Sequence, residues 1–212
     1  MKYGESLFDI LYLVFAIVLG FCILRRRRDD VSINMGTAVL ILGFGDSFHL
    51  VPRVLNYFIS ADFSVWLGVG KLVTSLTMTL FYLILYRIWV MIYGEEENHG
   101  LSVAVNVLAA VRIVLCLLPQ NRWLENEGSV VWGIIRNIPF VALGCIVVLL
   151  FHREREKIRA LGYVWLLVTL SFLFYIPVAV AASLVPLLGM LMLPKTVCYM
   201  LLIWVFWKYS TN

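Results

Sequence analysis

Long apolar stretches separated by short polar segments set the pattern of this chain. A helix needs about 20 apolar residues to cross a bilayer, and the chain offers seven stretches of roughly that length or more. The pattern predicts helices over residues 7–24, 34–59, 65–93, 101–118, 130–151, 160–184 and 189–208. The last two divide one apolar run at Pro186 and Gly189. We therefore predict an all-α fold, a polytopic membrane helix bundle in which residues 1–212 form a single domain of seven transmembrane helices.

The composition supports this interpretation. Hydrophobic residues make up 62% of the 212 residues and charged residues 14%, whereas soluble domains average about 45–50% and about 25%. A soluble core of this size cannot bury such an apolar surplus. We therefore expect a multi-pass protein of the cell membrane, with membrane lipids as its surroundings.

Basic residues are distributed unevenly between the two expected sides. One side carries ten, namely Arg25 to Arg28, Arg87, Arg153, Arg155, Lys157, Arg159 and Lys208, and the other carries three, namely Lys2, Arg53 and Arg122. Basic segments favour the cytoplasm. The N-terminus is therefore expected outside and the C-terminus in the cytoplasm. The same bias accounts for the net charge of +4, so no nucleic-acid partner is predicted.

Charged residues interrupt the second predicted helix at GFGDSFHLVPR, residues 43–53. Asp46, His49 and Arg53 follow one another at i, i+3 and i+7, a spacing that places all three on one helix face. With a rise of about 1.5 Å per residue, this face lies in the outer half of the bundle. We expect the three side chains to point the same way, into the bundle.

Five basic residues should converge at this depth: Arg53, Lys71, Arg112, Arg136 and Lys195. The acids at comparable depth are Asp46 and Asp9. Structural ion pairing with snorkelling of the remaining basic side chains is one explanation. Because five cations and two carboxylates cannot all pair within the protein, we favour an outward-opening cavity that binds an anion. The expected ligand-binding residues are these five together with His49, Asn137, Tyr175 and Tyr199.

Several chemistries can be compared with this pattern. The three histidines, His49, His99 and His152, fall on opposite sides and cannot share a zinc ion. Ser47 is adjacent to Asp46 on a helix, where neighbouring side chains diverge, so the two cannot form a nucleophile and its acid partner. No phosphate-binding or dinucleotide-binding motif is present. We predict neither a metal nor a cofactor.

Two further functions depend on single side chains. Lys195 in the last helix would suit a retinal Schiff base with Asp46 as counter-ion. Asp46 and His49 could instead relay protons in a transporter whose basic cavity carries an anion. General acid catalysis by Asp46 on a lipid ether is the enzymatic possibility.

The segment LGFGDSFHLVPRV, residues 42–54, resembles the LxGDxxxLxPR stretch of the lysoplasmalogenase family of bacterial and animal membrane proteins. The matching residues are Gly45, Asp46, Leu50, Pro52 and Arg53. The resemblance implies a helical bundle that cleaves the vinyl-ether bond of lysoplasmalogens, with Asp46 as the catalytic aspartate and the basic residues holding the substrate phosphate. A second family aspartate has no counterpart here, since residues 170–180 contain Tyr175 and no carboxylate.

Two functions therefore remain open from the sequence. The first is a lysoplasmalogenase-like hydrolase that binds an anionic amphiphile or lipid phosphate and uses Asp46 as its acid. The second is a proton-coupled transporter or a receptor for a small anionic ligand, without catalysis. The oligomeric state does not follow from the residues.

Overall fold

The computed structural model describes residues 2–26, 28–94, 99–125, 129–181 and 185–211, and this part of the chain is all-helical. The seven long helices are α1 Lys2–Arg26, α2 Asp30–Phe58, α3 Ser64–Tyr93, α4 His99–Leu117, α5 Val130–Arg153, α6 Val164–Ala181 and α7 Met192–Thr211. Seven helices, with α6 and α7 each counted together with the turn before it, are long and apolar enough to cross a membrane. The prediction of an all-α fold with seven such helices is confirmed.

The helix bounds differ from the predicted ranges mainly at the ends. Helix α1 starts at Lys2 rather than residue 7, so Glu5 becomes part of the helix. The predicted break between the last two helices is formed by a 3-10 turn, η4 Pro186–Leu191. Residues 182–184, at the end of the predicted sixth helix, and the Glu95–Glu97 run lie outside the described residues. Three more 3-10 turns occur in the connections: η1 Pro119–Asn121, η2 Trp123–Glu125 and η3 Arg159–Leu161.

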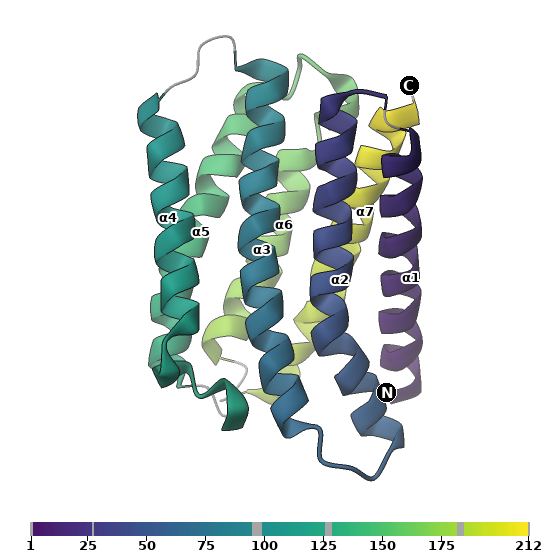
Figure 1. Cartoon of the computed structure of the whole chain (residues 1–212), viewed down its shortest axis with the longest axis vertical. Helices are drawn as coiled ribbons and strands as arrows, with labels where there is room; N and C mark the ends of the chain where they lie inside the picture. The colour runs from purple at the N-terminus through teal and green to yellow at the C-terminus, as the bar shows by residue number, and fades with distance from the viewer. Residues whose placement is uncertain (1, 27, 95–98, 126–128, 182–184, 212) are drawn as a thin grey trace.

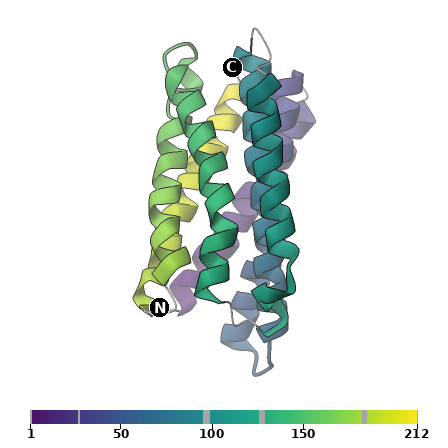
Figure 2. The same cartoon turned by 90° about the vertical axis from the view of Figure 1, so that its left-hand side faces the viewer.

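The helices pack as a closed ring in chain order (Figures 1 and 2). Each helix contacts the next, and α7 returns to contact α1. Helix α3 also contacts α5, and α2 also contacts α7. The C-terminal ends of α1, α3, α5 and α7 lie at one end of the bundle, and the N-terminus lies at the other (Figure 1). Which end faces the cytoplasm stays a prediction.

The outer surface of the bundle is apolar. On α1, the side chains of Leu7, Leu11, Val14 and Val18 are all more than half exposed and recur at helical spacing, whereas Tyr12 and Ala16 face the core. Soluble monomers rarely expose a continuous apolar stripe of this kind. The surface is therefore compatible with a lipid environment.

Glycines allow α2 and α3 to approach closely. A Cβ atom at Gly45 would overlap the side chain of Thr77, and one at Gly70 would overlap the backbone of Phe48 and His49. Small residues of this kind let the backbones of packed membrane helices come together. The Thr74 hydroxyl also donates a hydrogen bond to the Gly45 carbonyl at 3.1 Å. The α2–α3 contact fixes the depth of His49 relative to Lys71.

We predict that Gly45→Val lowers the apparent melting temperature of the purified protein. The added side chain must push α3 away, and overpacking of this kind costs roughly 1–3 kcal/mol. Gly4→Val is the matched control, because a Cβ at Gly4 meets nothing within 4 Å. Thermal unfolding in detergent, followed by tryptophan fluorescence, measures both variants. Equal melting temperatures for the two variants would contradict the close α2–α3 contact.

Candidate functional site

A cavity of about 610 Å³ lies inside the bundle. We call it the basic cavity, and its lining comprises His49, Lys71, Thr74, Ser75, Met78, Arg112, Trp123, Ser129, Val130, Gly133, Arg136, Asn137, Phe140, Tyr175, Val178, Ala179, Met192 and Lys195. Lys71, Arg136 and Lys195 lie within about two turns of the N-terminal ends of α3, α5 and α7. The cavity therefore occupies the half of the bundle nearer the N-terminus (Figure 1).

The lining is strongly cationic. Lys71, Arg112, Arg136 and Lys195 contribute four basic side chains, and His49 adds an imidazole. Among the residues that the structure describes, the lining contains no carboxylate. The structure thus brings seven of the nine expected ligand-binding residues to one cavity: His49, Lys71, Arg112, Arg136, Asn137, Tyr175 and Lys195. Their role in ligand binding stays a prediction.

Arg112 on α4 is the most buried of the cations. Its side chain is 2% exposed, and its guanidinium carbon lies 3.4 Å from the centroid of the Phe140 ring. The Nε and Nη1 groups have no hydrogen-bond partner within the described chain. Buried donors normally have an acceptor, so these two N–H groups identify a place where an anionic oxygen would be stabilised.

Arg136 on α5 is held by the connection between α4 and α5. Its Nη1 donates to Asn121 Oδ1 at 2.7 Å, and its guanidinium lies 4.4 Å from the Trp123 ring centroid. Asn121 is fully buried, and its amide donates to the carbonyls of Leu115 and Leu118 at the end of α4. Both partners of Arg136 are neutral, so its charge is positioned without being neutralised.

Lys195 on α7 lies between two tyrosines. Its Nζ is 4.9 Å from the Tyr175 ring centroid and 5.4 Å from that of Tyr199. Tyr199 does not line the basic cavity. Its hydroxyl lies 3.4 Å from that of Tyr82, and its ring supports the lysine. Tyr199, expected as a ligand residue, therefore lies behind Lys195, outside the lining of the cavity.

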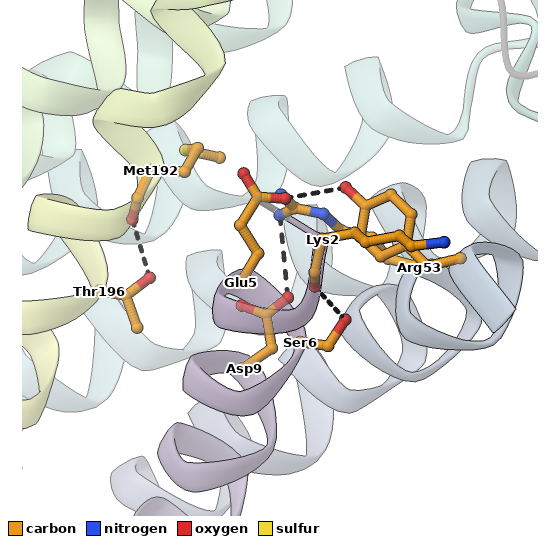
Figure 3. Close-up of polar contacts among 8 residues, drawn as sticks. Lys2, Glu5, Ser6, Asp9, Arg53, Met192 and Thr196 are labelled. Atoms are coloured by element: carbon orange, nitrogen blue, oxygen red, sulfur yellow. Dashed lines mark hydrogen bonds and ion pairs between the residues drawn. The ribbon is translucent and has the colours of Figure 1, made fainter.

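Arg53 does not line the basic cavity, and its guanidinium lies beside the carboxylates of Glu5 and Asp9 (Figure 3). Its Nη2 lies 3.4 Å from Glu5 Oε2, and its Nη1 lies 4.0 Å from Asp9 Oδ2, both on α1. The Tyr57 hydroxyl donates to the same Glu5 oxygen at 3.0 Å. The convergence of all five cations is thus wrong for Arg53, because α1 packs on this side of α2 and supplies two acids.

Asp46 also faces α1. Its Oδ2 accepts a hydrogen bond from the Tyr12 hydroxyl at 2.6 Å, and its carboxylate does not line the basic cavity. Lys195 is the cation close enough to exert electrostatic attraction on it. The expectation that Asp46, His49 and Arg53 all point the same way is therefore wrong, since only His49 reaches the cavity. The proposed catalytic role of Asp46 stays a prediction.

The histidines are separated along the bundle. His99 starts α4 and His152 ends α5, at the end of the bundle opposite to the basic cavity that His49 lines. Within the described ranges, no group of three His, Cys, Asp or Glu side chains lies close enough to hold a metal ion.

Sequence reasoning missed the aromatic and loop residues that support the cations, namely Asn121, Trp123 and Phe140. Asn121 and Trp123 lie in a polar connection that carries no periodic pattern, and Gly68 on α3 leaves room for the Trp123 carbonyl. Phe140 contacts Arg112 from a different helix, so the sequence spacing carried no signal for it either.

In comparisons with known proteins, no family model, no curated protein and no solved structure matches this chain. The fold and the cavity define the class: an all-α bundle of seven helices that are long and apolar enough to cross a membrane, with cationic side chains around an interior cavity. The likeness to lysoplasmalogenases stays a prediction.

We predict that Arg53→Met destabilises the bundle, because it leaves Glu5 and the buried Asp9 without their cation. Losing a partner of a buried polar group costs about 1–3 kcal/mol, and the low end applies because the Arg53 side chain is 27% exposed. The double variant Arg53→Met with Asp9→Asn should recover part of the loss. Melting temperatures measure each variant.

Arg155→Met serves as the control for this experiment. Arg155 pairs with Glu156 at an exposed position, where ion pairs contribute about 0–1 kcal/mol. If Arg53→Met melted at the same temperature as Arg155→Met, the α1–α2 ion cluster would have no structural role.

Proposed function

We propose that this chain is a multi-pass protein of the cell membrane whose basic cavity binds the anionic head group of a membrane amphiphile. The observation that carries the proposal is the lining of the cavity, which combines four cations with no carboxylate among the described residues. We place the N-terminal end of the bundle, and with it the cavity, outside the cell.

Electrostatics favours an anion in this position. Like charges gathered in a low-dielectric interior repel one another, and a bound anion offsets that repulsion. The nearby acids lie outside the lining, where Asp46 accepts from Tyr12, and Glu5 and Asp9 pair with Arg53. Asp46 also attracts Lys195 and offsets part of its charge. The aromatic and hydrogen-bonding contacts of Arg112 and Arg136, with Phe140, Trp123 and Asn121, are all to neutral groups. Guanidinium groups suit a phosphate head group, because they donate several charge-assisted hydrogen bonds at once.

The apolar part of the lining favours an amphiphile over a free hydrated ion. Met78, Phe140, Val178 and Met192 line the same cavity as the cations. A fully hydrated anion would gain nothing from these side chains, whereas the first methylene groups of a lipid would contact them favourably. The cavity thus offers basic side chains for the head group and apolar side chains for the start of the hydrocarbon chain.

The charge distribution supports the proposed orientation. The end of the bundle that carries the C-terminus also holds the C-terminal ends of α1, α5 and α7 (Figure 1). Arg25, Arg26 and Arg28 lie at or just after the end of α1, Lys157 lies just after α5, and Lys208 lies in the last turn of α7. The opposite end carries Lys2, Arg53 and Arg122, and basic segments are retained in the cytoplasm. The cavity, near the N-terminus, would then open toward the outer leaflet.

Binding without chemistry is the function that this geometry supports best. A hydrolase of the lysoplasmalogenase type would need Asp46 beside the substrate ether. The Asp46 carboxylate instead accepts from Tyr12 outside the cavity lining. We infer a receptor or transporter of an anionic amphiphile, and we treat ether hydrolysis as the alternative outcome of the tests.

Hexadecyl phosphate should raise the apparent melting temperature of the purified protein, and hexadecanol should not. A ligand that binds only the folded state adds about 2.7 kcal/mol at 100 times its Kd. Arg112→Gln should weaken this affinity by about tenfold or more, because the guanidinium provides charge-assisted hydrogen bonds. Arg155→Gln, at an exposed position far from the cavity, is the control. Equal stabilisation by hexadecanol, or unchanged affinity in Arg112→Gln, would refute the proposed head-group site.

Asp46→Asn should bind hexadecyl phosphate at least as tightly as the wild-type protein. Asp46 lies outside the lining and attracts Lys195, so removing its negative charge leaves the cavity more positive. Incubation with a lysoplasmalogen, followed by aldehyde detection, tests the alternative. Release of aldehyde by the wild-type protein but not by Asp46→Asn would make the protein a hydrolase.

A further inference from the structure

A second hollow lies on the outer face of the bundle, between α5 and α6. It has a volume of about 420 Å³, and we call it the α5–α6 groove. Ile138, Ile176 and Val180 line it and are 63%, 41% and 42% exposed, so the groove opens on the apolar surface. Its residues on α5, Gly133 to Ala142, belong to the same half of the bundle as the basic cavity.

The groove and the basic cavity adjoin each other. Gly133, Asn137, Tyr175 and Ala179 line both. A Cβ at Gly133 would meet only the Ala179 carbonyl oxygen, at 3.7 Å. The small residues Gly133 and Ala179 therefore leave little side-chain bulk at the junction between the two hollows.

We infer that the ligand of this protein is an amphiphile taken laterally from the membrane, with its anionic head group in the basic cavity and one hydrocarbon chain in the α5–α6 groove. This inference rests on the proposed function, and it specifies the occupant of the groove and the direction of access. The ligand would enter between α5 and α6.

The chemistry of the junction matches a boundary between head group and chain. The Tyr175 hydroxyl donates to Asn137 Oδ1 at 2.9 Å, and the Asn137 amide donates to the Gly133 carbonyl at 2.8 Å. Because these polar atoms are hydrogen-bonded to one another, a hydrocarbon chain beside them would not leave them without a partner. On one side of the pair lies Lys195 over the Tyr175 ring, and on the other lie isoleucine and valine side chains.

The surroundings of the groove favour a membrane source for the ligand. A soluble anion would enter the basic cavity from water and would gain no binding energy from an apolar groove. In the proposed membrane location, lipid chains would surround exposed residues such as Ile138 and could enter the groove without crossing water. The positive charge of the cavity and the adjoining apolar groove therefore both favour an anionic membrane amphiphile.

The first test locates the chain directly. Hexadecyl phosphate carrying a diazirine near the end of its chain is bound to the wild-type protein, photolysed and mapped by mass spectrometry. We expect labels on residues 134–142 and 176–180. Labelling that the Arg112→Gln variant abolishes depends on the head-group site. If such labels on the wild-type protein fell only on other helices, the groove assignment would be wrong and the head-group site would stand.

The second test blocks the groove. Ala142 lines the groove but not the basic cavity, so Ala142→Trp should fill the groove and lower hexadecyl phosphate affinity by about tenfold, equivalent to ~1.4 kcal/mol. Ala110→Trp is the control, because Ala110 is exposed on α4 and lines neither hollow. Ethyl phosphate, titrated by calorimetry, should bind both variants as it binds the wild-type protein.

The outcomes separate the two proposals. If ethyl phosphate binds both variants and Ala142→Trp retains wild-type affinity for hexadecyl phosphate, the groove assignment is wrong and the proposed function stands. If neither phosphate binds the wild-type protein, the proposed function fails and the groove assignment fails with it. If Ala142→Trp does not fold, the photolabelling pattern on the wild-type protein decides.

Discussion

Buried positive charge that is supported by aromatic rings is the constraint around which this bundle is organised. Arg112 lies on Phe140, Arg136 lies beside Trp123, and Lys195 lies between two tyrosines. The face of an aromatic ring attracts a cation through its quadrupole, typically by about 0.5–2 kcal/mol depending on burial. Unlike a carboxylate, the ring carries no net charge. The cations are therefore held in place while the cavity keeps its positive potential.

The acids are gathered on the opposite side of α2. Glu5 and Asp9 on α1 engage Arg53, and Tyr12 on α1 donates to Asp46. This arrangement keeps carboxylates out of the cavity lining in the described structure, although α2 itself carries groups of both signs. Lys195 lies at the border, since it lines the cavity and also attracts Asp46. The α1–α2 contact thus gathers the acids, with Lys195 of α7 beside Asp46, and the cations that line the cavity come from α3, α4, α5 and α7.

The sequence predicted the helices well because each apolar stretch is long and ends at polar residues. It also placed most of the cations correctly, since the rise per residue converts position into depth. It could not assign Arg53, because periodicity gives the face of a helix but not which neighbour packs there. The predicted first helix began at residue 7 and so excluded Glu5, which the structure places one turn before Asp9. Rings that meet cations across helices, such as Phe140 with Arg112, have no signature in sequence spacing.

Three of the four GD and PR residues of α2 have structural partners in this fold. Gly45 accommodates Thr77 of α3, Asp46 accepts from Tyr12, and Arg53 engages the acids of α1. These contacts are sufficient to explain why a membrane helix carries such residues, so their presence alone does not require catalysis. Among the described residues that line the cavity, Arg112 on α4 has two buried nitrogens without a hydrogen-bond partner, Nε and Nη1, and His49 on α2 has one, Nδ1. Any account of function must therefore begin at the basic cavity, to which α2 contributes His49 while its charged residues Asp46 and Arg53 face α1.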